Sequence, residues 1–211
     1  MTPAEPHSIV LAADYRVRDL QRMWTDLKGR QSDLAEIGAR FVVMYASSTE
    51  PGRVLTTVGV RSRAPLEGLL RSPAIFEWFD SAGVEDIPPI FAGDVVEKIS
   101  AVGSRRAYPP GVLVSAMAKI DHLSVLIAEI HSHLGEFARR GVRELWVYQA
   151  FDDDREVMLM HDTPDEHTAR RWIDSPDENA VWMRGGSVEY PSPFVGRLFD
   201  IMRVDPDRRD G

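Results

Sequence analysis

Three aromatic side chains are the clearest candidates for a binding site in this sequence. Trp146 and Tyr148 lie two residues apart in a β-forming run, so strand alternation places both rings on one face. Tyr45 corresponds to Tyr148 in an internal sequence repeat. Two phenols and an indole lining an apolar cavity would suit a flat or apolar molecule, which the hydroxyl groups would orient. The alternative is that the three rings fill a core.

His161 is the candidate catalytic residue. It ends a predicted strand and is followed by Asp162 and then by a helix start. A histidine at this place could act as a general base or as a haem ligand. The other copy of the repeat has Val58 at the corresponding position, so such a site would be asymmetric. We place His161 near the mouth of the predicted cavity, and a surface or capping role is the alternative.

Other kinds of site find little support in the sequence. The chain contains no cysteine, which excludes disulfides, thiolate metal sites and a cysteine nucleophile. His131 and His133 are two residues apart on a predicted helix, about 200° around it, so they cannot bind one metal together. No Ser-His-Asp order or glycine-rich phosphate loop is present. No metal site and no cofactor are therefore predicted, and haem and flavin stay open.

Composition and charge limit the classes of partner. The chain has 211 residues, of which 44% are hydrophobic and 27% charged, typical of a globular protein. Its formal charge of −8 argues against nucleic acid and anionic membranes as partners. No apolar run approaches the roughly 18 residues that span a bilayer, and the N-terminus lacks the pattern of a signal peptide. We expect a cytoplasmic protein that is a monomer or homodimer.

The elements that must position these residues come in two copies. Ser72–Gly93 recurs at Ser175–Gly196, an offset of 103 residues. Six residues match at this offset without a gap: Ser72/Ser175, Pro73/Pro176, Gly83/Gly186, Pro88/Pro191, Phe91/Phe194 and Gly93/Gly196. Most are residue types that fix turns and helix starts. We expect Phe91 and Phe194 to be buried equivalently, each anchoring its proline-containing loop.

Each copy of the repeat has the predicted element order β-α-β-β-α-β. Residues 1–102 form the first copy and residues 112–211 the second. Residues 103–111 between them are small, charged and turn-forming, which is typical of a linker. In both copies the long predicted helix ends at a glycine, Gly38 or Gly141, which suits a helix C-cap.

This order resembles two ferredoxin-like folds, each a four-stranded antiparallel sheet with its helices on one face. The uncovered face would expose apolar side chains at about 25 cal/mol per Å², so we expect the two faces to pack together. Over about residues 8–204 the chain resembles the dimeric α+β barrel superfamily, which includes antibiotic-biosynthesis-type monooxygenases, EthD-like proteins and haem-degrading monooxygenases. The resemblance implies an α+β fold in which two ferredoxin-like repeats pack sheet to sheet as an intramolecular barrel.

The resemblance leaves two functions open. One is an enzyme, a cofactor-independent monooxygenase or isomerase acting on an aromatic or polyketide-like substrate inside the barrel. The other is a non-catalytic barrel that binds a small apolar molecule or serves as a structural or sensor module. No sequence motif decides between them, because a fold hosts many functions.

Overall fold

The computed structural model describes residues 9–204 apart from positions 82, 85–87, 102–110 and 175–191. The strands are β1 (Ile9–Arg16), β2 (Ala39–Ser47), β3 (Arg53–Val60), β4 (Ile90–Ser100), β5 (Val112–Lys119), β6 (Glu144–Ala150), β7 (Glu156–Thr163) and β8 (Phe194–Arg203). The helices are α1 (Leu20–Gly29), α2 (Gln31–Glu36), α3 (Arg63–Leu70), α4 (Ala74–Ser81), α5 (Leu123–Ser132), α6 (Leu134–Arg139) and α7 (Glu166–Ile173). Nearly all of the predicted linker 103–111 lies outside the described residues.

The sequence repeat is also a structural repeat. The starts of α1 and α5, of α2 and α6, and of α3 and α7 are each separated by the same 103 residues that separate the two copies in the sequence. The glycines that end the long helical segments, Gly38 and Gly141, both have positive φ, 76° and 91°. Such values favour glycine, which explains why it occurs at both positions. The predicted α+β class and the β-α-β-β-α-β order are confirmed.

The chain divides into two compact units. Unit 1 comprises residues 1–92 and 199–211, and unit 2 comprises residues 93–198. These limits differ from those of the sequence repeats, because β4 and β8 each begin in one unit and end in the other. The predicted repeat boundaries describe the duplication of the sequence, and they stay a prediction.

Within each unit the sheet is antiparallel and follows the same plan. In unit 1, β3 pairs with β1 and with β2. In unit 2, β7 pairs with β5 and β6, and β6 also pairs with β4. The last strand of each sequence repeat ends in an equivalent hydrogen bond at 2.9 Å, from Ala101 N–H to the Arg143 carbonyl in unit 2 and from Val204 N–H to the Arg40 carbonyl in unit 1.

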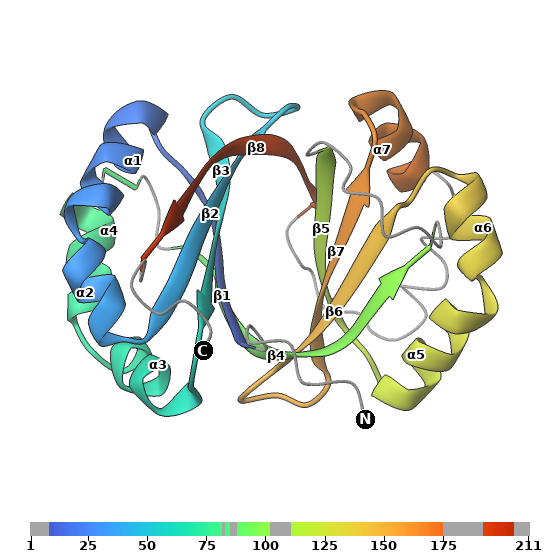
Figure 1. Cartoon of the computed structure of the whole chain (residues 1–211), viewed down its shortest axis with the longest axis horizontal. Coiled ribbons are helices and arrows are strands. Elements are labelled where there is room, and N and C mark those ends of the chain that lie inside the picture. Colours follow the sequence, from blue (N-terminus) through green and yellow to red (C-terminus); the bar gives the residue numbers. More distant parts are fainter. Residues whose placement is uncertain (1–8, 82, 85–87, 102–110, 175–191, 205–211) are drawn as a thin grey trace, which may run out of the picture. The chain divides into compact units, whose positions relative to one another are not determined.

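Helices cover one face of each sheet. Figure 1 shows α1 to α4 together on one side of β1, β2 and β3, and α5 to α7 on one side of β5, β6 and β7. The buried core of unit 2 contains alternate strand residues such as Leu145 and Val147 together with Phe137 and Trp172 from the helices. Alternation along β6 therefore places Trp146 and Tyr148 on the helix-free face of that sheet.

The two phenylalanines of the repeated loop are buried alike. Phe91 at the start of β4 and Phe194 at the start of β8 are each only 2% exposed. The prediction that they are equivalent core residues is confirmed.

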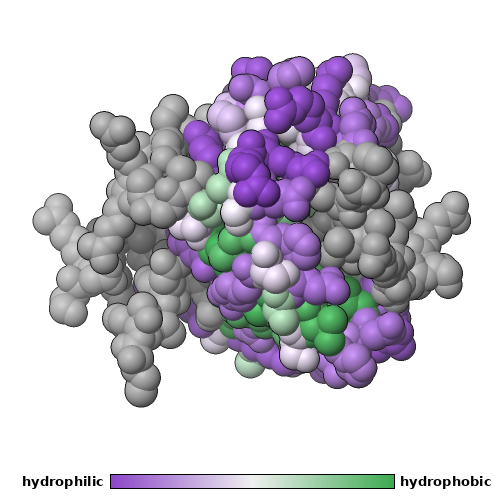
Figure 2. Space-filling model, turned by 90° about the vertical axis from the view of Figure 1, so that its right-hand side faces the viewer, coloured by the Kyte–Doolittle hydropathy of each residue, from purple (hydrophilic) through white to green (hydrophobic). Residues whose placement is uncertain are grey.

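The outer surface of unit 2 is mainly polar. Figure 2 views its helix-bearing side, where hydrophilic residues predominate and hydrophobic ones appear in small areas. Val125 on α5 is an exposed apolar side chain. Within the described residues, no helix is long and apolar enough to cross a membrane.

Candidate functional site: a cavity under the helices of unit 1

Alternate residues of β1 and β3 face the helices of unit 1. The two strands pair with Ala13 opposite Thr56 and Tyr15 opposite Val54, and paired residues share one face of a sheet. Tyr15 and Thr56 are therefore diagonal neighbours on that face. Their hydroxyl oxygens are 2.7 Å apart, which makes a hydrogen bond in the buried interior.

A cavity of about 170 Å³ lies between this face and the helices. Its lining is mainly aliphatic and aromatic. Each of the helices α1, α2 and α3 contributes a leucine to it: Leu27, Leu34 and Leu69. Helix α4 contributes Trp78 and Phe79, whose ring centroids are 4.8 Å apart. The sheet contributes smaller apolar side chains and the two hydroxyl groups.

The polar groups of the cavity are of two kinds. Burial raises the pKa of Tyr15 well above its ordinary value, and the hydrogen bond with Thr56 opposes only part of this effect. Tyr15 is therefore a neutral hydroxyl at physiological pH. Arg30 and Asp33 also line the cavity and form an ion pair at 4.0 Å, with side chains that are 44% and 67% exposed. The cavity thus combines a buried hydroxyl pair with a charged rim that reaches the solvent.

The same places in unit 2 are filled by rings. Leu34, Leu69 and Val58 of the cavity correspond in the repeat to Phe137, Trp172 and His161. The Phe137 and Trp172 rings pack edge to face with centroids 5.0 Å apart, and the His161 ring lies 5.3 Å from Trp172. Unit 1 has aliphatic side chains at these three positions. They are smaller than the rings of unit 2, and the space that they leave is part of the cavity.

The hydroxyl pair is also particular to unit 1. Tyr15 corresponds to Ala118 in the repeat, and Thr56 corresponds to Leu159. Neither residue of unit 2 can donate or accept a side-chain hydrogen bond. The layer between sheet and helices therefore differs between the two units in its polar groups as well as in its rings.

His161 lies in a different place from the one that the sequence predicts. In the strand ladder it pairs with Leu145, which belongs to the helix-covered core, so the two side chains share that face. His161 is 3% exposed, and burial lowers its pKa to about 4, so the ring is neutral at pH 7. The period of two along β7 separates it from Trp146, which pairs with Met160 on the other face. The geometry gives His161 a core position under α7 rather than one near an opening.

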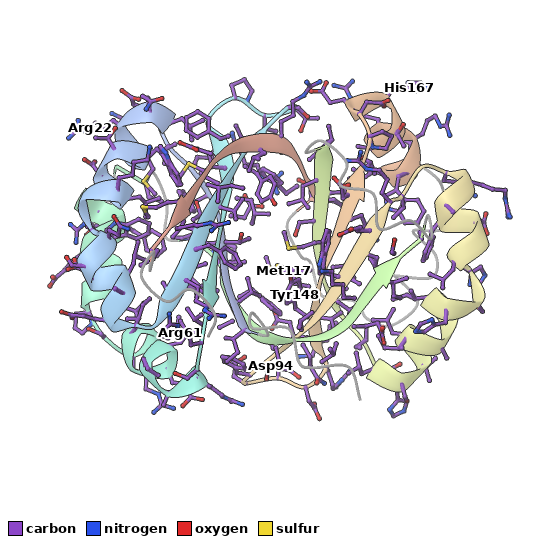
Figure 3. All side chains as sticks on the ribbon, viewed as in Figure 1. Arg22, Arg61, Asp94, Met117, Tyr148 and His167 are labelled. Carbon is purple, nitrogen blue, oxygen red and sulfur yellow. The ribbon has the colours of Figure 1, made fainter. Side chains whose placement is uncertain are left out.

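The three predicted ring residues lie on helix-free faces in two different units. Trp146 and Tyr148 share the helix-free face of unit 2, and Tyr148 and Met117 lie there on the side away from α5 to α7 (Figure 3). Tyr45 lies in unit 1 next to Met44, which is fully buried on the helix-covered face of β2 opposite Thr56. Alternation therefore puts Tyr45 on the helix-free face of unit 1. That the three rings line one cavity stays a prediction.

Metal-binding groups are not gathered at the cavity. Asp33 is the single carboxylate among the described residues that line it. Among all described residues, no cluster of three or more histidine or acidic side chains could hold a metal ion.

Comparison with known proteins identifies the fold. No family model and no curated protein matches the sequence. An anthrone oxidase-like protein of known structure is similar over 98% of both chains, with a TM-score of 0.71 and 8% identity. A monooxygenase-like protein from Listeria innocua covers 90% of this chain and 94% of its own, at a TM-score of 0.54 and 8% identity. The chain shares its fold with these proteins.

A third protein of known structure is similar over most of the chain. It is an uncharacterised ferredoxin-fold protein from Listeria monocytogenes related to antibiotic biosynthesis monooxygenases, with a TM-score of 0.53 and 6% identity. It covers 92% of this chain and 97% of its own. Identities this low show the fold alone, which agrees with the predicted α+β class, and they carry no residue roles across.

The sequence contains an indication of the cavity in residues other than Tyr45, Trp146 and Tyr148. A residue-by-residue comparison of the two copies shows Leu34 against Phe137 and Leu69 against Trp172. The mismatch of Val58 and His161 indicated asymmetry, but it suggested a catalytic histidine in unit 2. In the structure His161 belongs to the ring cluster of unit 2. Val58, its counterpart, lines the cavity of unit 1, where the equivalent positions carry no rings.

Proposed function

We propose that this protein binds a small, mainly apolar molecule in the cavity of unit 1. The observation that carries the proposal is an apolar cavity of about 170 Å³ beside a buried hydroxyl pair. Protein interiors seldom contain voids larger than a water molecule. Apolar cavities of about 150 Å³ take up benzene or xenon. The cavity therefore has the size and lining of a site for one small ligand.

Stability gives a second reason to regard the cavity as functional. Apolar space left between packed side chains lowers the free energy of unfolding, because the surrounding side chains lose contacts that a filled core would make. Larger side chains at Leu34 and Leu69 would remove this cost, as Phe137 and Trp172 do in unit 2. A sequence that leaves the space open is consistent with selection for binding.

Calorimetric titration with toluene tests the proposal. We expect the protein to bind toluene with a Kd of about 1 mM or tighter, a free energy of about −4 kcal/mol. Leu69→Trp introduces the ring that unit 2 carries at this position, and it should abolish binding by filling the cavity. Val125→Trp adds the same indole at an exposed site on α5 and should leave binding unchanged. Equal affinity in the wild type and Leu69→Trp would contradict the proposal.

Oxygenation of the bound molecule is the second candidate function. It is favoured by the anthrone oxidase-like and monooxygenase-like proteins that share the fold. Within the cavity Tyr15 is held neutral and so acts as a hydrogen-bond donor, which leaves Asp33 as the lining carboxylate able to accept a proton. Oxygen uptake with a bound phenol, measured for the wild type and Asp33→Asn, tests this candidate. Uptake that requires Asp33 would support an enzyme, and none above the rate without protein would leave a binding protein.

A further inference from the structure

The cavity also indicates what its ligand is. Resting on the binding function proposed above, we infer that the ligand is a flat single-ring aromatic molecule with one neutral hydroxyl group, the size and polarity of a phenol. Three independent features of unit 1 lead to this class of ligand: the volume of the cavity, the rings around it and the hydroxyl pair.

The volume sets the upper limit. Sites for drug-sized molecules usually occupy about 300–1,000 Å³. The cavity has about 170 Å³, little more than the apolar cavities that hold one benzene molecule. A single substituted ring fits this space, whereas a fused three-ring molecule would have to extend past the charged rim into the solvent. The cavity therefore selects a smaller ligand than the polyketide-like substrate that the sequence suggests.

The surrounding rings favour an aromatic ligand. Phe79 packs edge to face with Tyr15 at a centroid distance of 5.9 Å and also contacts Trp78. All three rings line the cavity, and aromatic rings prefer edge-to-face or offset partners. Unit 2 shows which shapes suit the equivalent space, because Phe137 and Trp172 occupy it as an edge-to-face pair. A ligand ring in unit 1 would take the place of these missing side-chain rings.

The hydroxyl pair sets the polarity. Tyr15 and Thr56 together have two O–H donors, and their mutual hydrogen bond uses one of them. One O–H and several lone pairs can therefore face a ligand. Because burial holds Tyr15 in its neutral form, the pair suits a neutral group that both donates and accepts, as a phenolic hydroxyl does. A charged group beside the hydroxyl pair would lose its hydration there, and the charged side chains that line the cavity, Arg30 and Asp33, lie at its exposed rim and pair with each other.

A double variant separates the hydroxyl pair from the rest of the cavity. Y15F with T56V removes both hydroxyls while nearly keeping the shapes of the side chains, and removing both partners of a hydrogen bond often changes stability little. The single variants are less informative, because each leaves one hydroxyl that can still bond to a ligand. Calorimetric titration of the wild type and the double variant would use phenol, toluene and the three-ring phenol 9-phenanthrol, with circular dichroism to verify folding.

For the wild type we expect phenol and toluene to bind and 9-phenanthrol not to bind. In the double variant the affinity for phenol should fall about tenfold relative to that for toluene, as expected for a buried hydrogen bond lost on the ligand. If both ligands bind but their affinity ratio is unchanged in the double variant, the inference is wrong and the binding function stands. Binding of 9-phenanthrol as tight as that of phenol would overturn the inference on size. If no probe binds to the wild type, both the inference and the proposed function fail.

Discussion

Unit 1 and unit 2 fold the same repeated sequence pattern around different interiors. Below its helices unit 2 has a cluster of three rings, in which the centroids of Phe137 and His161 lie 5.0 and 5.3 Å from that of Trp172. Unit 1 has aliphatic side chains at these positions and a cavity of about 170 Å³. The difference shows that equivalent positions of a duplicated fold can hold packed rings in one copy and line a cavity in the other.

Several contacts of the scaffold around the two interiors are repeated. Val17 N–H donates to the Gly52 carbonyl at 2.9 Å, and the equivalent Ile120 N–H donates to the Arg155 carbonyl at 2.8 Å. The ion pair of Arg16 with Glu50 has its counterpart in Lys119 with Asp153. The two copies thus keep these contacts at the strand ends, while they differ in the layer between sheet and helices, where volume and polarity decide what can bind.

Loss of the buried rings of Phe91 and Phe194 should have the largest effect on stability. The effect should be similar in the two copies. We expect Phe91→Ala and Phe194→Ala each to lower the free energy of unfolding by about 3–5 kcal/mol, because both rings are 2% exposed. Denaturant unfolding measures this. A large loss in one variant and none in the other would show that the two copies do not share this part of the core.

Substitutions at the equivalent residues Leu69 and Trp172 should change the free energy of unfolding by different amounts in the two copies. Trp172→Leu gives unit 2 the residue of unit 1, and we expect a loss of about 2–4 kcal/mol from the cavity that it creates. The reciprocal Leu69→Trp should cost far less, since an existing cavity receives the ring. Equal losses for the two variants in denaturant unfolding would contradict the comparison.

His161 should make the stability depend on pH through unit 2. Its pKa is about 4 in the folded protein and 6.5 ordinarily, so between these values the unfolded chain binds the proton that the folded chain excludes. The free energy of unfolding should therefore fall as the pH drops from about 6.5 to 4, by about 3 kcal/mol in total. His161→Val introduces the residue of unit 1 and should remove this contribution.

The control for this effect is His131→Ala, because the His131 side chain is half exposed. This variant shows how much of any change in the pH profile of unfolding comes from removing a histidine at the surface. A wild-type profile that His161→Val leaves unchanged between pH 4 and 7 would show that His161 is not a buried neutral group.

The fold could be predicted because its signals are local and occur twice. Gly38 and Gly141 end helices with positive φ, and Phe91 and Phe194 are buried alike, as the gapless repeat indicates. Strand alternation also placed Trp146 and Tyr148 correctly on one face of β6. Such features depend on residue type and spacing, which a sequence displays directly.

The cavity could not be predicted in the same way, because it depends on volumes that several elements share. Leu34 and Leu69 look like ordinary core residues until the rings at the same positions of the other copy are compared with them. The face on which His161 lies depends on the pairing of β7 with β6, where it is opposite Leu145. Register and packing of this kind follow from the folded chain rather than from any one segment.

Xenon binding measured by crystallography tests most directly the claim that unit 1 is open where unit 2 is filled. Xenon enters apolar cavities of this size without needing a polar partner. We expect one xenon site in unit 1 between Leu34, Leu69 and Phe79, and none beside Phe137 and Trp172 in unit 2. Leu69→Trp should remove the site in unit 1, and Trp172→Leu should create one in unit 2. Xenon in unit 2 of the wild type, or in neither unit, would contradict the claim.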